Sequence, residues 1–171
     1  MPTQGGLINT NALAIQYDRT AQDPRDDSAI GLWNRLLNDN FNGDSWIVTS
    51  KNLRLDSTRP GFVIEKVLPT GTYIAAIVTE PKPQHQTMLQ GQPVDNQALE
   101  NAISALNSGR SRGQQKVFVL RVVGTQMIAF KVTVDEPSLM PLTEDFMDVK
   151  IHGVNTGQIF DQIMNANVLE P

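Results

Sequence analysis

The sequence predicts an α+β protein with a mostly antiparallel sheet or a partly open barrel, two or three short helices and extended terminal arms. Two observations carry this prediction. Residues 99–106 place apolar side chains at the spacing of one helical face, and residues 116–134 form two strand-like runs around a tight turn. The main domain is expected over 28–136, between an extended N-terminal arm, 1–27, and an acidic extension, 137–171.

The N-terminal arm contains few side chains that could be buried, so we expect it to be extended, with one short strand over 12–17. Ser28 is expected to cap a short helix, because a serine side chain can accept from the free amides of a first turn. The turn-rich residues 38–44 end this helix. Its apolar stripe is formed by Ile30, Trp33 and Leu37, with Trp33 expected in the core.

The next part of the chain carries the pattern of strands, which we place at 45–50, 52–56 and 61–67. Residues 73–78 are continuously apolar, and periodicity cannot assign so short a run to strand or helix. Gly71 and Pro81 at its ends, with β-branched side chains inside it, favour a strand.

The helix in the centre of the chain has the clearest signals. Asp95 and Asn96 are suitable N-cap residues, and Gly109 can adopt the positive φ that often ends a helix. Burying its leucines and isoleucine contributes roughly 1.5–3 kcal/mol for each side chain. The apolar face consists of Leu99, Ala102, Ile103 and Leu106.

A two-residue turn, Gly124-Thr125, joins a run over 116–123 to a run over 126–134. Glycine in the first position fits a type II′ hairpin turn, whose twist matches that of the flanking strands. The first run is apolar on both faces except at Lys116 and Arg121, which predicts a central strand covered on both sides. In the second run one face carries Ile128, Phe130, Val132 and Val134.

The C-terminal extension is acidic, and we expect its carboxylates on a solvated face. They include Glu144, Asp145 and Asp148. Asn155 or Thr156 is expected to cap a short last helix. The apolar face of that helix consists of Ile159, Phe160, Ile163 and Met164.

Three segments have patterns that are similar to those of a known domain family. They are residues 61–69, Gly91-Gln92-Pro93-Val94 with the helix after it, and the hairpin over 116–134. Together, residues 61–134 resemble a bacterial-type PDZ domain. The resemblance implies a module in which a peptide adds a strand beside the second helix, with Leu99 and Ile103 lining the groove. The sequence departs from that family before Gly61, where the glycine loop that captures a peptide carboxylate is missing.

Composition excludes several classes of protein. The chain has no cysteine, which excludes disulfides, thiolate zinc sites and cysteine catalysis. The formal net charge of -4 argues against a nucleic-acid binder, which needs cationic surface. No basic segment followed by an apolar core marks a secretion signal, and no apolar run approaches the ~20 residues of a membrane span. We expect a cytoplasmic protein or a component of a particle such as a virion, without a membrane partner.

The ionisable residues form no strong catalytic pattern. Paired-histidine phosphoesterases use a His-x-Thr tripeptide twice; His85 opens one copy, but His152 is followed by Gly153-Val154. No serine lies in a nucleophile elbow, and no loop has the ligand spacing of a calcium site. We therefore expect no catalytic, cofactor-binding or metal-binding residue. A small hydrolase or phosphoesterase that uses His85 is the alternative.

The first functional hypothesis is a non-enzymatic interaction or assembly protein, for example a structural component of a virion. It would bind protein subunits, either copies of itself or other chains, by strand addition and through its arms, and form a homo- or hetero-oligomer. A PDZ-like peptide-binding module is a further alternative. The expected partner-binding residues combine an aromatic anchor, the groove implied beside the helix and a basic loop: Trp46, Leu99, Ile103, Arg110 and Arg112.

Overall fold

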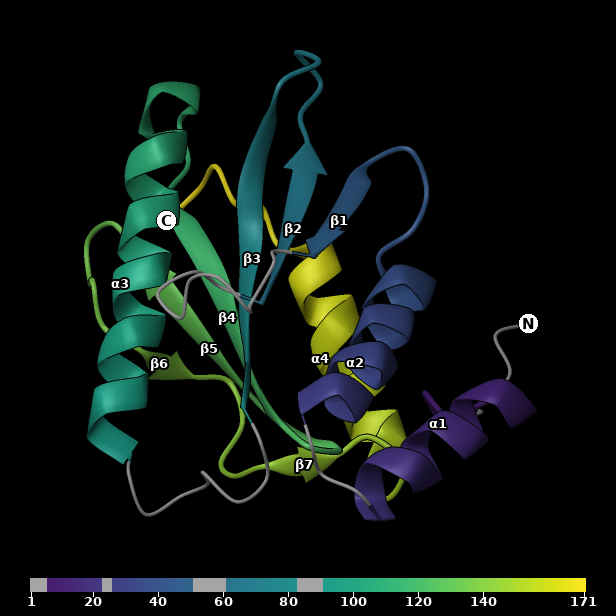
Figure 1. Cartoon of the computed structure of the whole chain (residues 1–171). Coiled ribbons are helices and arrows are strands. Elements are labelled where there is room, and N and C mark those ends of the chain that lie inside the picture. The colour runs from purple at the N-terminus through teal and green to yellow at the C-terminus, as the bar shows by residue number, and fades with distance from the viewer. Residues whose placement is uncertain (1–5, 23–25, 51–60, 83–90) are drawn as a thin grey trace.

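The computed structural model describes residues 6–22, 26–50, 61–82 and 91–171. In this part of the chain, one open seven-stranded sheet carries helices on both faces (Figure 1). The predicted α+β class with a mostly antiparallel sheet is confirmed, and the described strands do not close into a barrel. The helices are α1 (Asn11–Gln22), α2 (Asp26–Asn40), α3 (Gly91–Gly109), the short 3-10 helix η3 (Arg110–Arg112) and α4 (Gly153–Asn165).

The strands are β1 (Trp46–Ser50), β2 (Phe62–Val67), β3 (Tyr73–Lys82), β4 (Lys116–Val123), β5 (Gln126–Thr133), β6 (Met140–Pro141) and β7 (Met147–Asp148). The sheet has the order β1-β2-β3-β4-β5-β6, and β7 also pairs with β5. The described pairs are antiparallel except for β3 and β4, which are parallel. Helix α3 lies between these two strands in the chain, because a parallel pair requires a crossover connection.

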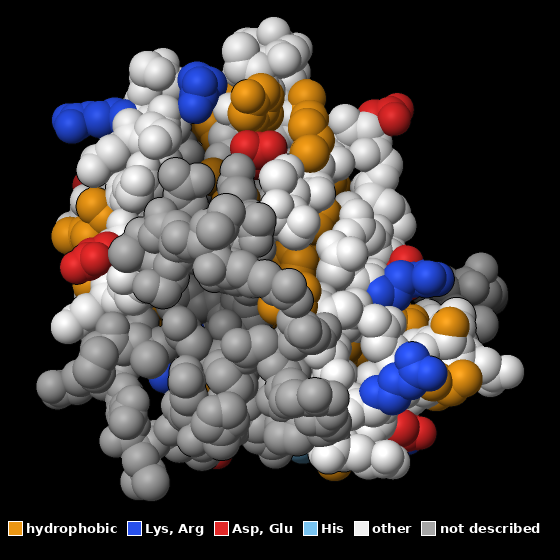
Figure 2. Space-filling model, in the orientation of Figure 1, with side chains coloured by type: hydrophobic (Ala, Val, Ile, Leu, Met, Phe, Trp, Pro, Cys, Tyr) orange, Lys and Arg blue, Asp and Glu red, His pale blue; other side chains and the backbone are white. Residues whose placement is uncertain are grey.

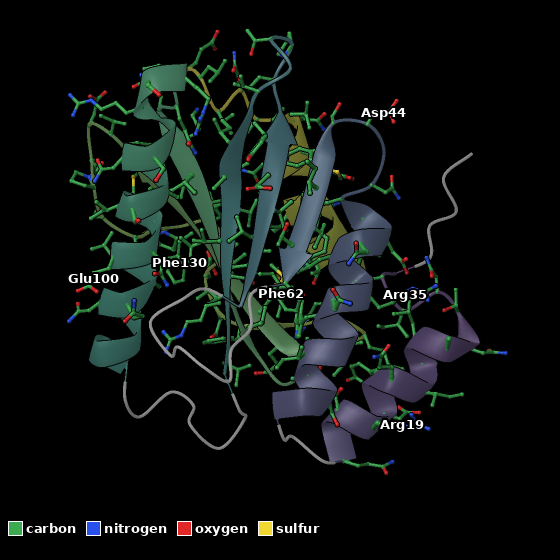
Figure 3. All side chains as sticks on the ribbon, turned by 45° about the horizontal axis from the view of Figure 1, so that its top comes forward. Arg19, Arg35, Asp44, Phe62, Glu100 and Phe130 are labelled. Carbon is green, nitrogen blue, oxygen red and sulfur yellow. The ribbon has the colours of Figure 1, made fainter. Side chains whose placement is uncertain are left out.

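Different helices cover the two faces of the sheet. Helix α3 packs on one face, where Ala102 and Leu106 join a buried cluster with Val119 of β4. Helices α1, α2 and α4 lie on the other face and bury a larger cluster around Phe62 (Figure 1). Figure 3 shows Phe62 on the side of α2 and Phe130 on the side of α3. The interior is therefore divided into two clusters by the sheet.

Strand β4 is buried on both faces, which confirms the prediction of a central strand. Its side chains alternate between the two clusters, with Val117 and Val119 on the α3 side and Phe118, Leu120 and Val122 on the other. The hairpin with β5 is also confirmed. Val123 pairs with Gln126, and Gly124 has φ 57°, in the left-handed region that favours glycine.

Trp33 lies in the core, as predicted. Its side chain has no exposed surface, and its indole Nε1 donates to the carbonyl oxygen of Gly124 at 2.8 Å. This bond satisfies the one polar atom of a buried tryptophan and a backbone carbonyl of the β4–β5 turn. Helix α2 is thereby tied to the end of the central hairpin.

The apolar run at 73–78 is part of strand β3, as the flanking residues indicated. Ile64 pairs with Ile77 and Glu65 pairs with Ala75, so Ala76 is an extra residue in β3. A bulge of this kind breaks the alternation of side chains. As a result, Ala76 and Ile77 both pack into the cluster below α2, which explains why the sequence shows no period of two here.

The N-terminal arm is not extended, and the strand expected over 12–17 is wrong. The segment forms helix α1, which buries Leu13 and Thr20. Thr10 supplies the start signal, because its Oγ1 accepts from the amide of Leu13 at 3.2 Å. Thr20 Oγ1 donates to the carbonyls of Gln16 and Ser28, so a polar side chain is buried without losing its hydrogen bonds.

Helix boundaries account for the other corrections. Helix α2 begins at Asp26, α3 at Gly91 and α4 at Gly153, so the expected caps all lie inside helices. These caps were Ser28, Asp95, Asn96, Asn155 and Thr156. The described residues contain four α-helices, where two or three short ones were expected, and α3 is 19 residues long. The strand expected over 52–56 lies outside the described residues.

Candidate interaction surface

On one face of the sheet, the described helices cover only some of the strands. Helix α3 packs over β3, β4 and β5, and it does not reach over β1 (Figure 1). Side chains alternate along a strand, and Trp46, Val48, Ile64 and Ile74 point into the cluster below α2. Their neighbours on β1, β2 and β3 therefore point to the α3 side, beyond the edge of that helix. We call these residues the β1–β3 patch: Ile47, Thr49, Glu65, Val67, Tyr73 and Ala75.

The β1–β3 patch combines four apolar residues with Thr49 and Glu65, and two of its apolar side chains are exposed. Tyr73 is 53% exposed and Ile47 is 43% exposed, which is high for large hydrophobic side chains on a sheet. The register pairs Ile47 with Glu65 and Val67 with Tyr73, so these four side chains are neighbours across three strands. Figure 2 shows hydrophobic side chains around one acidic side chain on this face, near the β2–β3 turn.

Strand β1 forms an edge of the sheet. Among the described residues it pairs with β2 alone, so one side of its backbone is without a neighbouring strand there. Natural edge strands are often protected by lysine, proline or an inward-pointing charge. The five residues of β1, Trp46 to Ser50, include none of these. The edge is therefore suited to pairing with a further strand.

A second feature is a buried polar cluster around Asp148. The carboxylate accepts from the Tyr17 hydroxyl at 3.0 Å and from Thr125 Oγ1 at 2.6 Å. It also accepts from the backbone amides of Lys150 at 2.9 Å and Ile151 at 3.1 Å. Asp148 is only 6% exposed, so the prediction that it lies on a solvated acidic face is wrong. Two of its four donors, Tyr17 and Thr125, lie far away in the sequence.

The hydrogen bonds and the burial of this cluster shift the pKa of Asp148 and of Tyr17. Burial acts to raise the pKa of Asp148, but donation from Thr125, Ile151, Lys150 and Tyr17 outweighs burial and lowers it. The pKa of Tyr17 is raised, first by burial and then by its bond to the Asp148 carboxylate. The pair is therefore an ionised acceptor and a neutral donor at neutral pH. Such a pair stabilises the fold and is a poor source of a transferable proton.

No protein-family model, curated protein or solved structure matches this chain. Within the described ranges, every helix is too short or too polar to cross a membrane. No group of three His, Asp or Glu side chains in those ranges is placed to hold a metal ion. The resemblance to PDZ domains stays a prediction.

The structure separates the residues that were expected to bind a partner. Trp46 lies on the α2 side of the sheet, where its ring packs edge-on against Phe41 with 5.3 Å between centroids. Lys66 Nζ lies 5.5 Å from the centre of the same ring. Trp46 is thus half-buried and lies on the opposite face from the β1–β3 patch.

The remaining expected residues lie on α3 and η3. Leu99 packs against the cluster under α3, whereas Ile103 lines a shallow depression of about 500 Å³ with Glu100 and Ser104. Arg110 and Arg112 are exposed, and Arg112 donates to the carbonyl of Ser108 at 3.0 Å. The structure does not bring these residues together with Trp46.

The two histidines do not test the hydrolase alternative. His85 lies outside the described residues. His152 is exposed just before α4, and its Nδ1 accepts from the backbone amide of Asp148 at 3.1 Å.

The β1–β3 patch was not predicted from the sequence, because the strand pattern does not tell which strands α3 will cover.

Proposed function

We propose that this chain is a non-enzymatic assembly protein that pairs with a second copy of itself through strand β1. The observation that carries the proposal is the β1–β3 patch beside an edge strand without protective charges. Strand addition satisfies the backbone groups of such an edge and extends the sheet. The exposed hydrophobic side chains next to the edge would then be covered in part by the second copy.

Two-fold symmetry defines the geometry of this pairing. In an antiparallel β1–β1 pair centred on Val48, Ile47 of each copy faces the partner's Thr49 on the patch side. On the other side Val48 faces the partner's Val48. The two apolar patches become neighbours, which adds buried apolar area to the main-chain hydrogen bonds. Because β1 has only five residues, we expect association to depend on protein concentration.

A larger assembly would need another contact, because a two-fold pair closes on itself. The exposed Arg110 and Arg112 on η3 are the candidates, since the chain as a whole is acidic with a net charge of -4. In this fuller form of the proposal the chain is a structural component of a cytoplasmic particle or of a virion.

The test is sedimentation velocity over a series of protein concentrations. We expect a monomer–dimer equilibrium for the natural chain. The double variant Ile47→Lys with Thr49→Lys should be monomeric, because like charges then face each other twice across the two-fold axis. Changing Ile47→Glu with Thr49→Lys should restore the dimer, because each acid then faces a base of the partner. Circular dichroism confirms that each variant is folded.

The control is Val154→Lys, which adds a charge at an exposed apolar residue of α4, away from the patch. This variant should dimerise like the natural chain. A natural chain that stays monomeric at every concentration contradicts the proposal. So does a dimer that survives the double lysine variant, because that result places the contact elsewhere.

A further inference from the structure

A polar cleft opens on the other side of the molecule, where three segments meet. It has a volume of about 420 Å³ and lies between the residues before α1, the end of α2 and the middle of α4. This size falls in the range of small-molecule sites. We call it the Asn/Asp cleft after its polar lining. Its lining includes Asn9, Asn38, Asn40, Asn42, Gly157 and Asp161.

Each of three lining asparagines already donates an amide N–H to a backbone carbonyl. Asn38 Nδ2 donates to the carbonyl of Asn34, Asn40 Nδ2 to that of Leu36 and Asn42 Nδ2 to that of Asp39, each at 2.7 Å. Carbonyl oxygens only accept, so these bonds fix which end of each amide faces the backbone. The amide oxygens have no partner among the described residues and are the acceptors left to meet a ligand, while Asn40 and Asn42 each keep one further N–H.

The Asn/Asp cleft is also negatively charged, so its charge and its free oxygen atoms favour the same kind of ligand, a cation that donates hydrogen bonds. Asp161 carries a carboxylate with no ion-pair partner in the described part of the chain, while Asp39 is paired with Arg35 at 2.8 Å. The C-terminal end of α2 also lies at the cleft, where the helix dipole places partial negative charge, and the bonds from Asn40 and Asn42 offset part of it. No basic residue lies in the last turn of α2 to offset it. The cleft therefore presents acceptors and negative potential.

We infer that the Asn/Asp cleft binds a guanidinium group, such as the arginine side chain of a peptide or protein partner. A guanidinium offers five N–H donors and no acceptor, which matches a lining of amide and carboxylate oxygens. Its plane can bond a carboxylate with two parallel hydrogen bonds, which an ammonium cannot do. This inference is independent of the β1 pairing.

Gly157 gives a way to close the cleft without disturbing the fold. A Cβ at this position would come no closer than 3.9 Å to Leu7 Cδ2, which is an ordinary contact. A short side chain is therefore tolerated, and a long one would extend into the cleft. Gly157→Gln is the blocking variant and Gly157→Ala is its matched control.

The experiment is an NMR titration of the full isotope-labelled chain with N-acetyl-arginine amide. We expect saturable shifts at residues 38–42 and 157–161. Asp161→Asn should weaken binding by about tenfold, the loss expected for one hydrogen bond to a charged group. Gly157→Gln should abolish the shifts, and Gly157→Ala should keep them. Asp145→Asn removes the same charge from an exposed position outside the cleft and should leave binding unchanged.

Three results would overturn the inference. The first is the absence of saturable shifts at these residues in the natural chain. The second is an equal loss of binding in Asp161→Asn and Asp145→Asn, which would indicate a general effect of net charge. The third is equal binding of N-acetyl-lysine amide, which would exclude recognition of the guanidinium plane.

Discussion

The hydroxyl of Tyr17 lies 3.0 Å from both carboxylate oxygens of Asp148, a residue 131 positions later in the chain. This contact joins helix α1 to the turn that leads into α4. Thr125 Oγ1 donates to the same carboxylate from the β4–β5 turn at 2.6 Å. Three parts of the chain that are distant in sequence therefore meet at one ionised group.

Changing Tyr17→Phe removes one donor from the Asp148 carboxylate. We expect the free energy of unfolding to fall by about 1.5–3 kcal/mol, the range for a hydrogen bond to a charged group. Chemical denaturation measures the change. Tyr73→Phe is the control, because Tyr73 is 53% exposed and should shift stability by less than about 0.5 kcal/mol. Equal effects of the two substitutions would contradict a stabilising role for the Tyr17–Asp148 bond.

The lowered pKa of Asp148 makes stability depend on pH in the acid range. The unfolded chain binds a proton to this carboxylate at a higher pH than the folded chain does. The contribution is therefore present above the unfolded pKa and is lost as the pH falls through the lower folded pKa.

The measurement is the free energy of unfolding over this range for the natural chain and for Asp148→Asn. The variant should be less stable at neutral pH, and its stability should change less as the pH falls. Parallel pH profiles for the two proteins would show that Asp148 does not carry the expected dependence.

Two glycines one turn apart in α4 should respond oppositely to alanine. A Cβ on Gly153 would lie 3.0 Å from Gly6 Cα and 3.1 Å from Leu7 N, and backbone atoms cannot move aside as a flexible side chain can. Gly153→Ala should therefore destabilise the protein by about 1–3 kcal/mol. Gly157→Ala meets no such contact and should stabilise it by up to about 1 kcal/mol.

Thermal unfolding of the two alanine variants, recorded under one set of conditions, checks this pair. Gly153 is the first residue of α4 and Gly157 lies in its interior, so the gain in helix propensity is expected mainly at Gly157. A stabilising Gly153→Ala would mean that the residues before α1 do not pack against α4 as described.

Trp33→Phe tests the tie between α2 and the central hairpin. The substitution deletes the indole N–H that bonds the buried carbonyl of Gly124 and leaves space in the cluster below α2. We expect a loss of about 2–4 kcal/mol from the cavity and the unsatisfied carbonyl together. Hydrogen exchange should also accelerate at the β4–β5 turn. A cost below about 0.5 kcal/mol would contradict this account.

The elements predicted correctly from the sequence have signals that are local in the chain. The β4–β5 hairpin is specified by Gly124 between two β-branched runs, and the buried Trp33 lies on a clear helical stripe. The sequence predicts an extended arm in place of helix α1 because the segment has few apolar side chains, and Leu13 is buried in a cluster formed with residues of α2 and α4. The cap at Thr10 was the available signal.

The candidate surfaces could not be predicted in the same way. The burial of Asp148 depends on Tyr17, and no short-range pattern relates these two residues. The β1–β3 patch lies beside α3, which connects β3 to β4 and packs over β3, β4 and β5. The sequence does not show which strands this connecting helix will cover. The Asn/Asp cleft joins Asn9 to Asp161, near opposite ends of the chain.

The sheet between the two clusters has a consequence for how the protein tolerates change. Leu106 under α3 and Phe160 of α4 belong to separate clusters, with β4 between them. Changes at positions that share no neighbours usually combine additively. Substitutions in one cluster should therefore leave the packing of the other cluster unchanged. Each cluster can be redesigned, or can change in evolution, separately.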